Sequence, residues 1–464
     1  MKKKEPSMLC RAIAFACVAL LTATLVAQQV RPAGPVLFEG ALLIAGDGRA
    51  PLANAAFLVE DGTIRRVGRR DEVQAPAGAA RVDLSGKVVM PVLINAHGHP
   101  GFQKGLTFSR DNYTRETYLD DLHRAAYFGV RVVLSQGIDA GDLAYEIRRD
   151  QQRGLVGGAR LLTAGRGIGA PNAGPGAAAF QGIAYEVTTP EAGRAAVREL
   201  AAKNVDVVKV WVDDRGGRAP RLSPPVYRAI IDEAHRHGLR VNAHVFYHDD
   251  AVDLVDAGVD GFAHLVRDRE MDEALVAAIV RRGVYVMPNL GAAERGTHAG
   301  LPPWFEEPGL ATLLRDTVPA PVIARMRAAF TSREPAAAAA ARERYAVLQR
   351  SLRRLRAAGA RIILGSDTGL EDHVFGHAEQ RELEAMVGAG MTPAQAIVAA
   401  TSGTAEYLGL RDMGVVAAGK RADFLVLGAN PLDDIRHTRR IEAIYVDGRA
   451  LDRAAIRARL RAGE

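Results

Sequence analysis

Two histidines separated by one residue, His97 and His99, are the first side chains in the chain whose types and spacing suit metal chemistry. They end an apolar run typical of a β-strand, and residues two apart on a strand point to the same face. Two imidazoles at one strand end can therefore reach a single metal ion. By itself an H-x-H pattern is a weak signal, because most isolated instances are incidental.

Four further polar residues occupy comparable places in later apolar runs. Lys209 lies in VDVVKVW, His244 in LRVNAHV, His264 in VDGFAHL and Asp367 in RIILGSD. Taken singly, each has a structural interpretation: a hydrogen-bonded core histidine, a lysine that extends to solvent, or an aspartate that caps a helix. All six residues come from five separate runs in chain order, and this repetition favours one shared metal site.

The elements that must position these residues alternate between apolar runs and helical stretches. Eight such runs occur: VVMPVLINAH, VRVVLS, ARLLTA, VDVVKVW, LRVNAHV, VDGFAHL, VYVMPN and RIILGSD. The pattern predicts an α/β fold with a (β/α)₈ TIM barrel over residues 91–411, whose active site would lie at the carboxyl ends of the strands. A doubly wound open sheet is the alternative, but no G-x-G-x-x-G turn follows the first strand.

Strand-rich segments flank the predicted barrel. Residues 36–90 and 412–455 contain short apolar runs separated by turns, with Asp-Gly pairs at 61–62 and 447–448. Because chain termini often lie close together, we expect the two segments to form one small β-sandwich domain.

Two segments within the barrel region do not fit the alternating pattern. Residues 320–358 are rich in alanine and arginine and predict a solvated helical segment broken near Pro335. Residues 291–319 predict a long loop, in which Trp304 and Phe305 either shape a pocket or anchor the loop locally.

Residues 1–27 have the pattern of a secretory signal peptide. Basic residues precede an apolar run at 12–27 that ends in Ala27. The run is short for a membrane span, which needs about 20 residues, so cleavage and export to the periplasm or medium are expected rather than a retained membrane anchor. The only cysteines, Cys10 and Cys17, lie in this segment, so the mature chain would have neither disulfides nor thiol chemistry.

The charge pattern has no nucleic-acid footprint, and the expected partner is a small-molecule substrate. Without residues 1–27, which hold four basic residues and one acidic residue, the net charge of +6 would fall to +3. The arginines are spread along the chain and are not clustered with aromatic residues. No feature indicates an oligomeric state.

The chain resembles the amidohydrolase superfamily, in particular its binuclear-metal branch with a carboxylated lysine and its imidazolonepropionase- and prolidase-like members. The resemblance is carried by KVVMPVLINAHGH, by GHAEQRELEAMVGAGMTPAQAIVAATSGTAEYLGL, and by GVVAAGKRADFLVL with VDGR. Two positions depart from the pattern: Val92 replaces the usual glycine, and Asn95 replaces the usual aspartate.

The resemblance implies a set of metal ligands. His97, His99 and Asp367 would hold the more buried of two divalent metal ions, and His244 and His264 the more exposed one. Zinc suits these ligands best, although manganese, cobalt or iron could occupy them. Lys209 would bridge both ions after reaction with carbon dioxide, since an ammonium group has no free lone pair whereas a carbamate is anionic.

The implied reaction is hydrolysis of a carbon–nitrogen bond in an amide or cyclic amide, such as a dipeptide or an N-acyl amino acid. A metal-bridging hydroxide would attack the carbonyl, with Asp367 as general base and then acid. Three alternatives remain open: phosphotriester or lactone hydrolysis at the same site, a one-metal deaminase, and an exported binding protein without catalysis.

Four further residues are weaker candidates. His377 would orient a ligand or the substrate, or else lie on the surface of an early helix. Arg166, Tyr247 and Asn289 lie near predicted strand ends and would either contact substrate or support loops.

Overall fold

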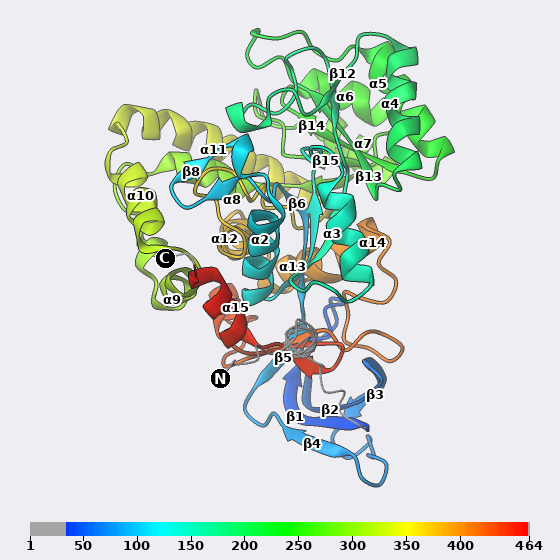
Figure 1. Ribbon diagram of the computed structural model, residues 1–464, viewed down its shortest axis with the longest axis vertical. Coiled ribbons are helices and arrows are strands. Elements are labelled where there is room, and N and C mark those ends of the chain that lie inside the picture. The colour runs from blue at the N-terminus through cyan, green and yellow to red at the C-terminus, as the bar shows by residue number, and fades with distance from the viewer. Residues whose placement is uncertain (1–33, 463–464) are drawn as a thin grey trace, which may run out of the picture.

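The computed structural model describes residues 34–462, and the predicted signal peptide with both cysteines lies outside this range. Figure 1 shows a large body of helices and central strands above a smaller, strand-rich end that contains β1 to β5. Among the described residues, no helix combines the length and the apolar character needed to span a bilayer.

The large body is built on eight strands, one from each apolar run of the sequence. In chain order they are β6 (Leu93–Gly98), β9 (Val130–Ser135), β10 (Arg160–Thr163), β13 (Val207–Val212), β14 (Arg240–Val245), β15 (Gly261–Ala263), β16 (Tyr285–Met287) and β17 (Arg361–Ile362). Strands β6, β9 and β10 form one parallel ladder, and β13 to β17 form another. Strands β6 and β13 are buried along their whole length, which explains why they appear as continuous apolar runs.

Backbone hydrogen bonds join the two ladders at both junctions. The amide of Asp206, just before β13, donates to the carbonyl of Thr163 in β10 at 2.8 Å. The amide of Ala96 in β6 donates to the carbonyl of Leu364, just after β17, at 2.9 Å. The eight strands therefore form the predicted (β/α)₈ barrel, and their carboxyl ends lie on one face.

Helices connect the strands and cover the outside of the barrel. They are α2 (Arg115–Tyr127), α3 (Leu143–Gln152), α4 (Pro190–Ala202), α5 (Pro224–Arg236), α6 (His248–Asp256), α7 (Glu273–Arg282) and α12 (His377–Gly388), followed by α13 (Pro393–Val398) and α14 (Thr404–Tyr407). Local sequence determines where several of them begin and end. Thr114, Thr189 and Asp272 accept hydrogen bonds from the first turns of α2, α4 and α7, and α7 ends at Gly283 with φ of 67°.

A helical insertion separates β16 from β17. It contains α8 (Leu290–Glu294), α9 (Pro308–Thr317), α10 (Ala320–Thr331) and α11 (Pro335–Ala357). Pro335 occupies the first turn of α11, where its missing N–H costs nothing, so the predicted helical segment is divided there. Trp304 and Phe305 are buried against Phe330 of α10, which makes them a local anchor.

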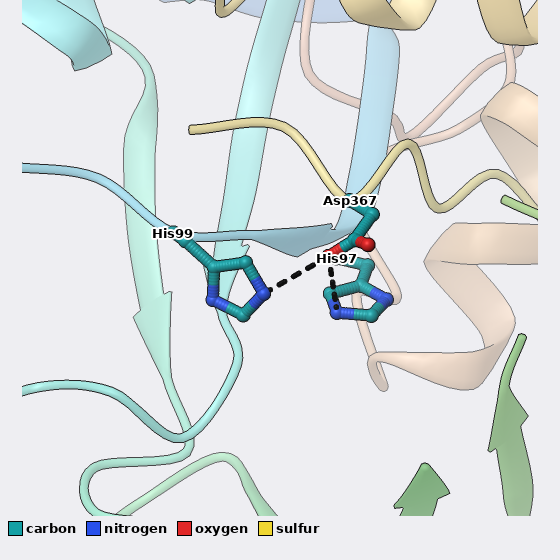
Figure 2. Close-up of side chains that lie close together, drawn as sticks. All are labelled: His97, His99 and Asp367. Carbon is teal, nitrogen blue, oxygen red and sulfur yellow. Dashed lines mark hydrogen bonds and ion pairs between the residues drawn. The ribbon is translucent and has the colours of Figure 1, made fainter. Parts of the chain in front are cut away.

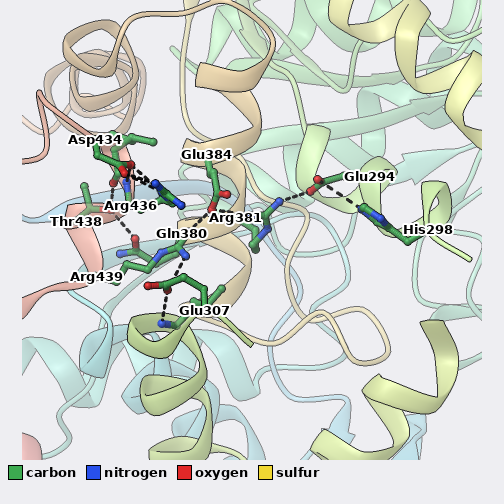
Figure 3. Close-up of polar contacts among 12 residues, drawn as sticks. Glu294, His298, Glu307, Gln380, Arg381, Glu384, Asp434, Arg436, Thr438 and Arg439 are labelled. Atoms are coloured by element: carbon green, nitrogen blue, oxygen red, sulfur yellow. Dashed lines mark hydrogen bonds and ion pairs between the residues drawn. The ribbon is translucent and has the colours of Figure 1, made fainter. Parts of the chain in front are cut away.

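Ion pairs fasten this insertion to α12 and to the short helix η6 (Ile435–Arg439) (Figure 3). Arg381 of α12 donates to Glu294 of α8 at 2.6 Å, and Arg439 donates to Glu307, which caps α9, at 3.0 Å. Both arginine side chains are almost completely buried, so each needs these carboxylates as partners.

The smaller part of the molecule is an eight-stranded mixed sheet made from both ends of the chain. The first segment supplies β1 (Val36–Leu43), β2 (Leu52–Glu60), β3 (Thr63–Arg69), β4 (Ala80–Asp83) and β5 (Val88–Pro91), and the last supplies β18 (Phe424–Leu427), β19 (Ile441–Val446) and β20 (Arg449–Ala450). Strand β5 pairs antiparallel with β18, which joins the two segments. Both Asp-Gly pairs form the expected hairpin turns, with positive φ at Asp61, Gly62, Asp447 and Gly448.

Minor elements complete the described chain. They are β7 (Gln103–Lys104), β8 (Thr107–Phe108), β11 (Ile168–Gly169), β12 (Tyr185–Glu186) and α15 (Arg453–Arg461), which packs on α2 and α9.

Candidate metal centre

All six predicted ligands line one cavity of about 630 Å³ at the carboxyl ends of the barrel strands. They are His97, His99, Lys209, His244, His264 and Asp367. The wall also contains apolar side chains, among them Phe108, Phe180, Trp211 and Leu370. The barrel thus brings together side chains that are up to 270 positions apart in the chain, since His97 and Asp367 come from the first and the last strand.

His97, His99 and Asp367 form the most compact group in the cavity (Figure 2). One carboxylate oxygen of Asp367, Oδ1, lies 3.0 Å from Nε2 of His99 and 3.2 Å from Nε2 of His97. The possible ligand atoms of the three residues all lie within 4.8 Å of one another. Figure 2 shows both imidazoles directed toward the carboxylate.

Two of the predicted ligands have an unusual backbone conformation. The φ angle is 55° at Asp367 and 90° at His264, a region that L-residues other than asparagine and aspartate seldom adopt. Such angles persist only where the surrounding structure holds them, and they are concentrated at functional sites. Here they occur where the chain leaves β17 and β15 and aims the side chain into the cavity.

The four histidines lie side by side, and burial holds three of them in the neutral form. Ring centroids are 5.1 Å apart for His97 and His99, 5.2 Å for His97 and His264, and 4.6 Å for His244 and His264. Burial lowers the pKa of His97 and of His264 well below the ordinary value, and lowers the pKa of His244 to about 4. At neutral pH these three rings therefore keep a lone pair for a metal ion.

Asp367, in contrast to these rings, is charged. Burial alone would raise the pKa of its carboxyl, but nearby His97, His99 and Lys209 hold that pKa below its ordinary value. The carboxyl is therefore ionised at neutral pH and can act as a ligand or accept a proton.

Lys209 is a buried amine without a hydrogen-bond or ion-pair partner among the described residues. Its side chain comes from the centre of β13 and is 1% exposed, and its Nζ atom makes no hydrogen bond among the described residues. Burial lowers the pKa of the amine to about 7, against the opposing effect of Asp367. An unpartnered ammonium in this position would be costly, so the site favours the neutral, nucleophilic amine.

These side chains fit a centre of divalent metal ions. Neutral imidazoles and an ionised carboxylate are the donors that zinc and similar ions bind. The unpartnered Nζ of Lys209 lies in the same cavity, where a modification or a neighbouring charge would satisfy it. The donor chemistry agrees with the predicted ligand set.

Asn95, one of the two departures from the family pattern, connects the predicted ligand His97 to α12. Its side-chain oxygen accepts hydrogen bonds from the amides of His97 at 2.9 Å and Ser366 at 3.2 Å. Its amide nitrogen donates to Ser366 Oγ at 2.9 Å and to Glu379 Oε1 at 2.6 Å. Asparagine thus fills this position with every polar group paired. The other departure, Val92, is 1% exposed and belongs to the apolar core.

The weaker candidates have different surroundings. His377 is 3% exposed, so the surface alternative is wrong; its ring packs 5.6 Å from Trp304 in a small pocket apart from the ligand cavity. Asn289 is buried, and its Nδ2 lies 3.3 Å from Nδ1 of His97.

Arg166 donates to the carbonyl of Ile183 at 2.6 Å, and Tyr247 donates to Asp214 at 2.7 Å. Neither of these two belongs to the cavity wall, so both support loops.

Four charged residues of the cavity wall were not predicted from the sequence: Asp213, Arg215, Arg267 and Glu371. Asp213 Oδ2 lies 3.1 Å from Nε2 of His244, and Arg267 follows His264 by three positions. The available signal was their place just after β13 and β15, where side chains face the active end of a barrel.

The comparison with known families gives this site its context. The amidohydrolase family profile matches residues 88–451, which include every strand of the barrel and all six predicted ligands. The chain belongs to the amidohydrolase family. Among curated proteins, this amidohydrolase is similar to an uncharacterized protein of Mycobacterium tuberculosis, with 26% identity over 219 residues. That match covers 46% of this chain and 54% of the relative, so the chain spans about half the length of the curated relatives it matches.

Solved structures resemble this amidohydrolase over almost its whole length. A putative prolidase from Bifidobacterium longum has a TM-score of 0.72 and 27% identity, covering 92% of this chain and 98% of its own. Phenylurea hydrolase B has a TM-score of 0.70 and 25% identity, covering 91% and 98%. The barrel with an added domain is thus the shared architecture.

Proposed function

We propose that this amidohydrolase is a metal-dependent hydrolase of carbon–nitrogen bonds in small amides, with dipeptides and N-acyl amino acids as the first substrates to test. The observation that carries the proposal is the convergence of four histidines, a buried lysine and an ionised aspartate on one cavity. The names of the similar proteins, a putative prolidase and a phenylurea hydrolase, support carbon–nitrogen chemistry.

Two divalent ions, with zinc as the best fit, would be divided among these ligands. His97, His99 and Asp367 would hold one ion, His244 and His264 the other, and a carbamate on Lys209 would bridge them. When bound, such a pair lowers the pKa of water and polarises a carbonyl oxygen.

The lysine is suited to carbamate formation. Its neutral Nζ would form a bond to the carbon of carbon dioxide and release one proton, which leaves an anionic two-oxygen group. The burial that lowers the pKa of Lys209 to about 7 makes the neutral amine accessible at physiological pH.

Asp367 would move the proton of the reaction. Its ionised Oδ1, placed between the two histidines, would accept a proton from the attacking water and deliver it to the leaving nitrogen. Because the pKa of Asp367 is lowered, the carboxylate is ionised at neutral pH and has a lone pair free for that proton.

The test combines a substrate panel with metal analysis on one sample. Purified protein is assayed on dipeptides, N-acyl amino acids, lactones and a phosphotriester, while bound metal is measured by mass spectrometry. We expect two ions per chain and turnover of amides. If only the lactone or the phosphotriester is hydrolysed, the function is the alternative hydrolysis. One ion per chain would favour a deaminase. A metal-loaded protein inert to all of them would favour a binding protein.

Export is a separate part of the proposal. The leader at residues 1–27 supports cleavage after Ala27 and a periplasmic or secreted enzyme. Sequencing the amino terminus of the protein recovered from the periplasm or medium tests it.

A further inference from the structure

Arg267 brings a guanidinium group into the wall of the ligand cavity, where the family-type ligand set does not require one. The residue follows β15 and is held through its backbone, whose amide donates to the carbonyl of Phe246 at 2.9 Å. Its guanidinium carbon lies 5.6 Å from the centre of the Phe246 ring. The side chain is therefore positioned by the barrel rather than by a mobile loop end.

This guanidinium has no anionic partner. Within residues 34–462 it forms no ion pair within 4.0 Å, and its buried Nη2 atom makes no hydrogen bond. The two nearest acids are committed elsewhere: Asp213 to His244 and to the amide of Arg215, and Asp367 to His97 and His99. Burial lowers the pKa of Arg267, and the charges of Asp367 and Asp213 offset that effect only in part.

Arg267 is partly buried, and a cation shielded from water without an ion pair is costly; proteins retain one where a ligand supplies the opposite charge. Arginine is suited to this because its planar fork binds a carboxylate through two parallel hydrogen bonds. Its charge acts on both Lys209 and Asp367, so the group bound by Arg267 lies near the reacting centre.

We propose that Arg267 binds a carboxylate of the substrate, and that the substrates are amides with a free carboxylate near the scissile carbon–nitrogen bond. The inference rests on the proposed hydrolase function and narrows its substrate class. The rest of the cavity fits the same class, because Phe108, Phe180, Trp211 and Leu370 offer an apolar wall for the remainder of the molecule. Apolar N-acyl amino acids and dipeptides have both features.

The decisive experiment compares matched substrates that differ only in charge. The best acidic substrate of the panel is assayed beside its carboxamide analogue, with the wild type, R267M and R267K. We expect the wild type to prefer the acid by about 100-fold in kcat/KM, and R267M to lose that preference mainly through a higher KM. R267K should recover part of it, and metal content should stay at the wild-type level.

Arg269 provides the matched control. It follows Arg267 by two positions but lies outside the cavity wall, where it is exposed and pairs with Asp249. We expect R269M to change kcat/KM for the acid by no more than about threefold. If R269M and not R267M removed the preference for the acid, Arg267 would lose the assigned role.

A binding measurement separates this inference from the proposed function. N-acetyl-L-phenylalanine and its carboxamide are titrated by calorimetry into the chelator-treated wild type and R267M. We expect the acid to bind the wild type at least about tenfold more tightly than the carboxamide, and R267M to bind both alike. Equal binding of both compounds by the wild type would overturn the inference even if amides are hydrolysed. Loss of bound metal in R267M would instead place Arg267 among the supports of the metal centre and would also overturn it.

Discussion

Asp367 shows how much of the chemistry depends on the placement of a single residue. Its left-handed backbone, with φ of 55°, turns the carboxylate toward two histidines of the opposite end of the barrel sequence. Aspartate tolerates this conformation better than most residues, because its short side chain fits the left-handed region.

Replacing Asp367 with asparagine preserves the shape of the side chain but removes the proton acceptor. We expect kcat to fall by about 10²–10⁴-fold, because a positioned acid–base group contributes on that scale. Steady-state kinetics and metal analysis on the same preparation measure it. E371Q, a change at an exposed carboxylate of the same cavity, serves as the control and should retain activity. Undiminished hydrolysis by D367N at full metal content would refute the assigned role.

Lys209 is the second residue whose role has a direct test. In K209A both the amine and its carbamate are missing, so we expect loss of bound metal and of nearly all activity. A short carboxylic acid such as propionate can occupy the vacated space and supply two oxygens, so activity and metal binding should return in part. K203A, a change at a partly exposed lysine paired with Asp142, is the control. Full metal binding by K209A without any added acid would contradict the bridging role.

At the scale of elements, one side chain joins three pieces of the barrel. Asn95 of β6 bonds to Ser366, next to Asp367, and to Glu379 of α12. Burial raises the pKa of Glu379 to about 7, even though Asn95 and the Gly376 amide donate to its carboxylate. The hydrogen bond from Asn95 therefore links β6 to a carboxyl that titrates near neutral pH.

N95D, which restores the usual family residue, should destabilise the protein in a pH-dependent way. Two carboxylates would then face each other, and the pKa of Glu379 would rise further. A carboxyl with a raised folded-state pKa contributes its stability at low pH and loses it as pH rises through that pKa. We expect a loss of about 1–3 kcal/mol that grows between pH 5 and about pH 8.

Denaturant unfolding at several pH values measures this loss. The double variant N95D/E379Q should be more stable than N95D at high pH, because a glutamine amide can donate to the carboxylate introduced at position 95. A loss that is the same at every pH, or a double variant no better than N95D, would show that the charges of this pair do not control the effect.

The order of the elements could be predicted well from the chain, and their exact extent less so. Eight apolar runs became eight strands, because strands buried on both faces need apolar residues at nearly every position. The π-helical turn at residues 399–403 and the packing of Trp304 against His377 had no local signal. Both depend on which helices the barrel places next to each other.

At the scale of the whole molecule, the sheet formed by the two ends of the chain is directly connected to the strand that positions the first predicted ligands. Strand β5 pairs with β18 in the outer sheet and leads directly into β6, which carries His97 and is followed at once by His99. Because the predicted ligands lie in or after five different strands, metal ions bound to them would hold the barrel in its folded state.

Metal removal should therefore lower the thermal midpoint. An ion that binds only the folded chain stabilises it by about 4 kcal/mol at a thousandfold excess over its Kd. We expect chelation to reduce Tm by several degrees and added zinc to restore it, as measured by calorimetry. The double variant H97A/H99A should not respond to zinc. An unchanged Tm after complete removal of bound metal would contradict a centre shared among the strands.

The chain alone predicted a set of metal ligands, the order of strands and helices, and the pairing of its two ends, because these depend on residue type, spacing and local turn chemistry. Only the tertiary structure decided which side chains share the cavity with those ligands. Arg267, Asp213 and the aromatic wall carry no distinctive local pattern, and their importance arises from burial and neighbours far away in the chain. A charged side chain can be recognised as unpaired only when the positions of all its possible partners are known from the tertiary structure.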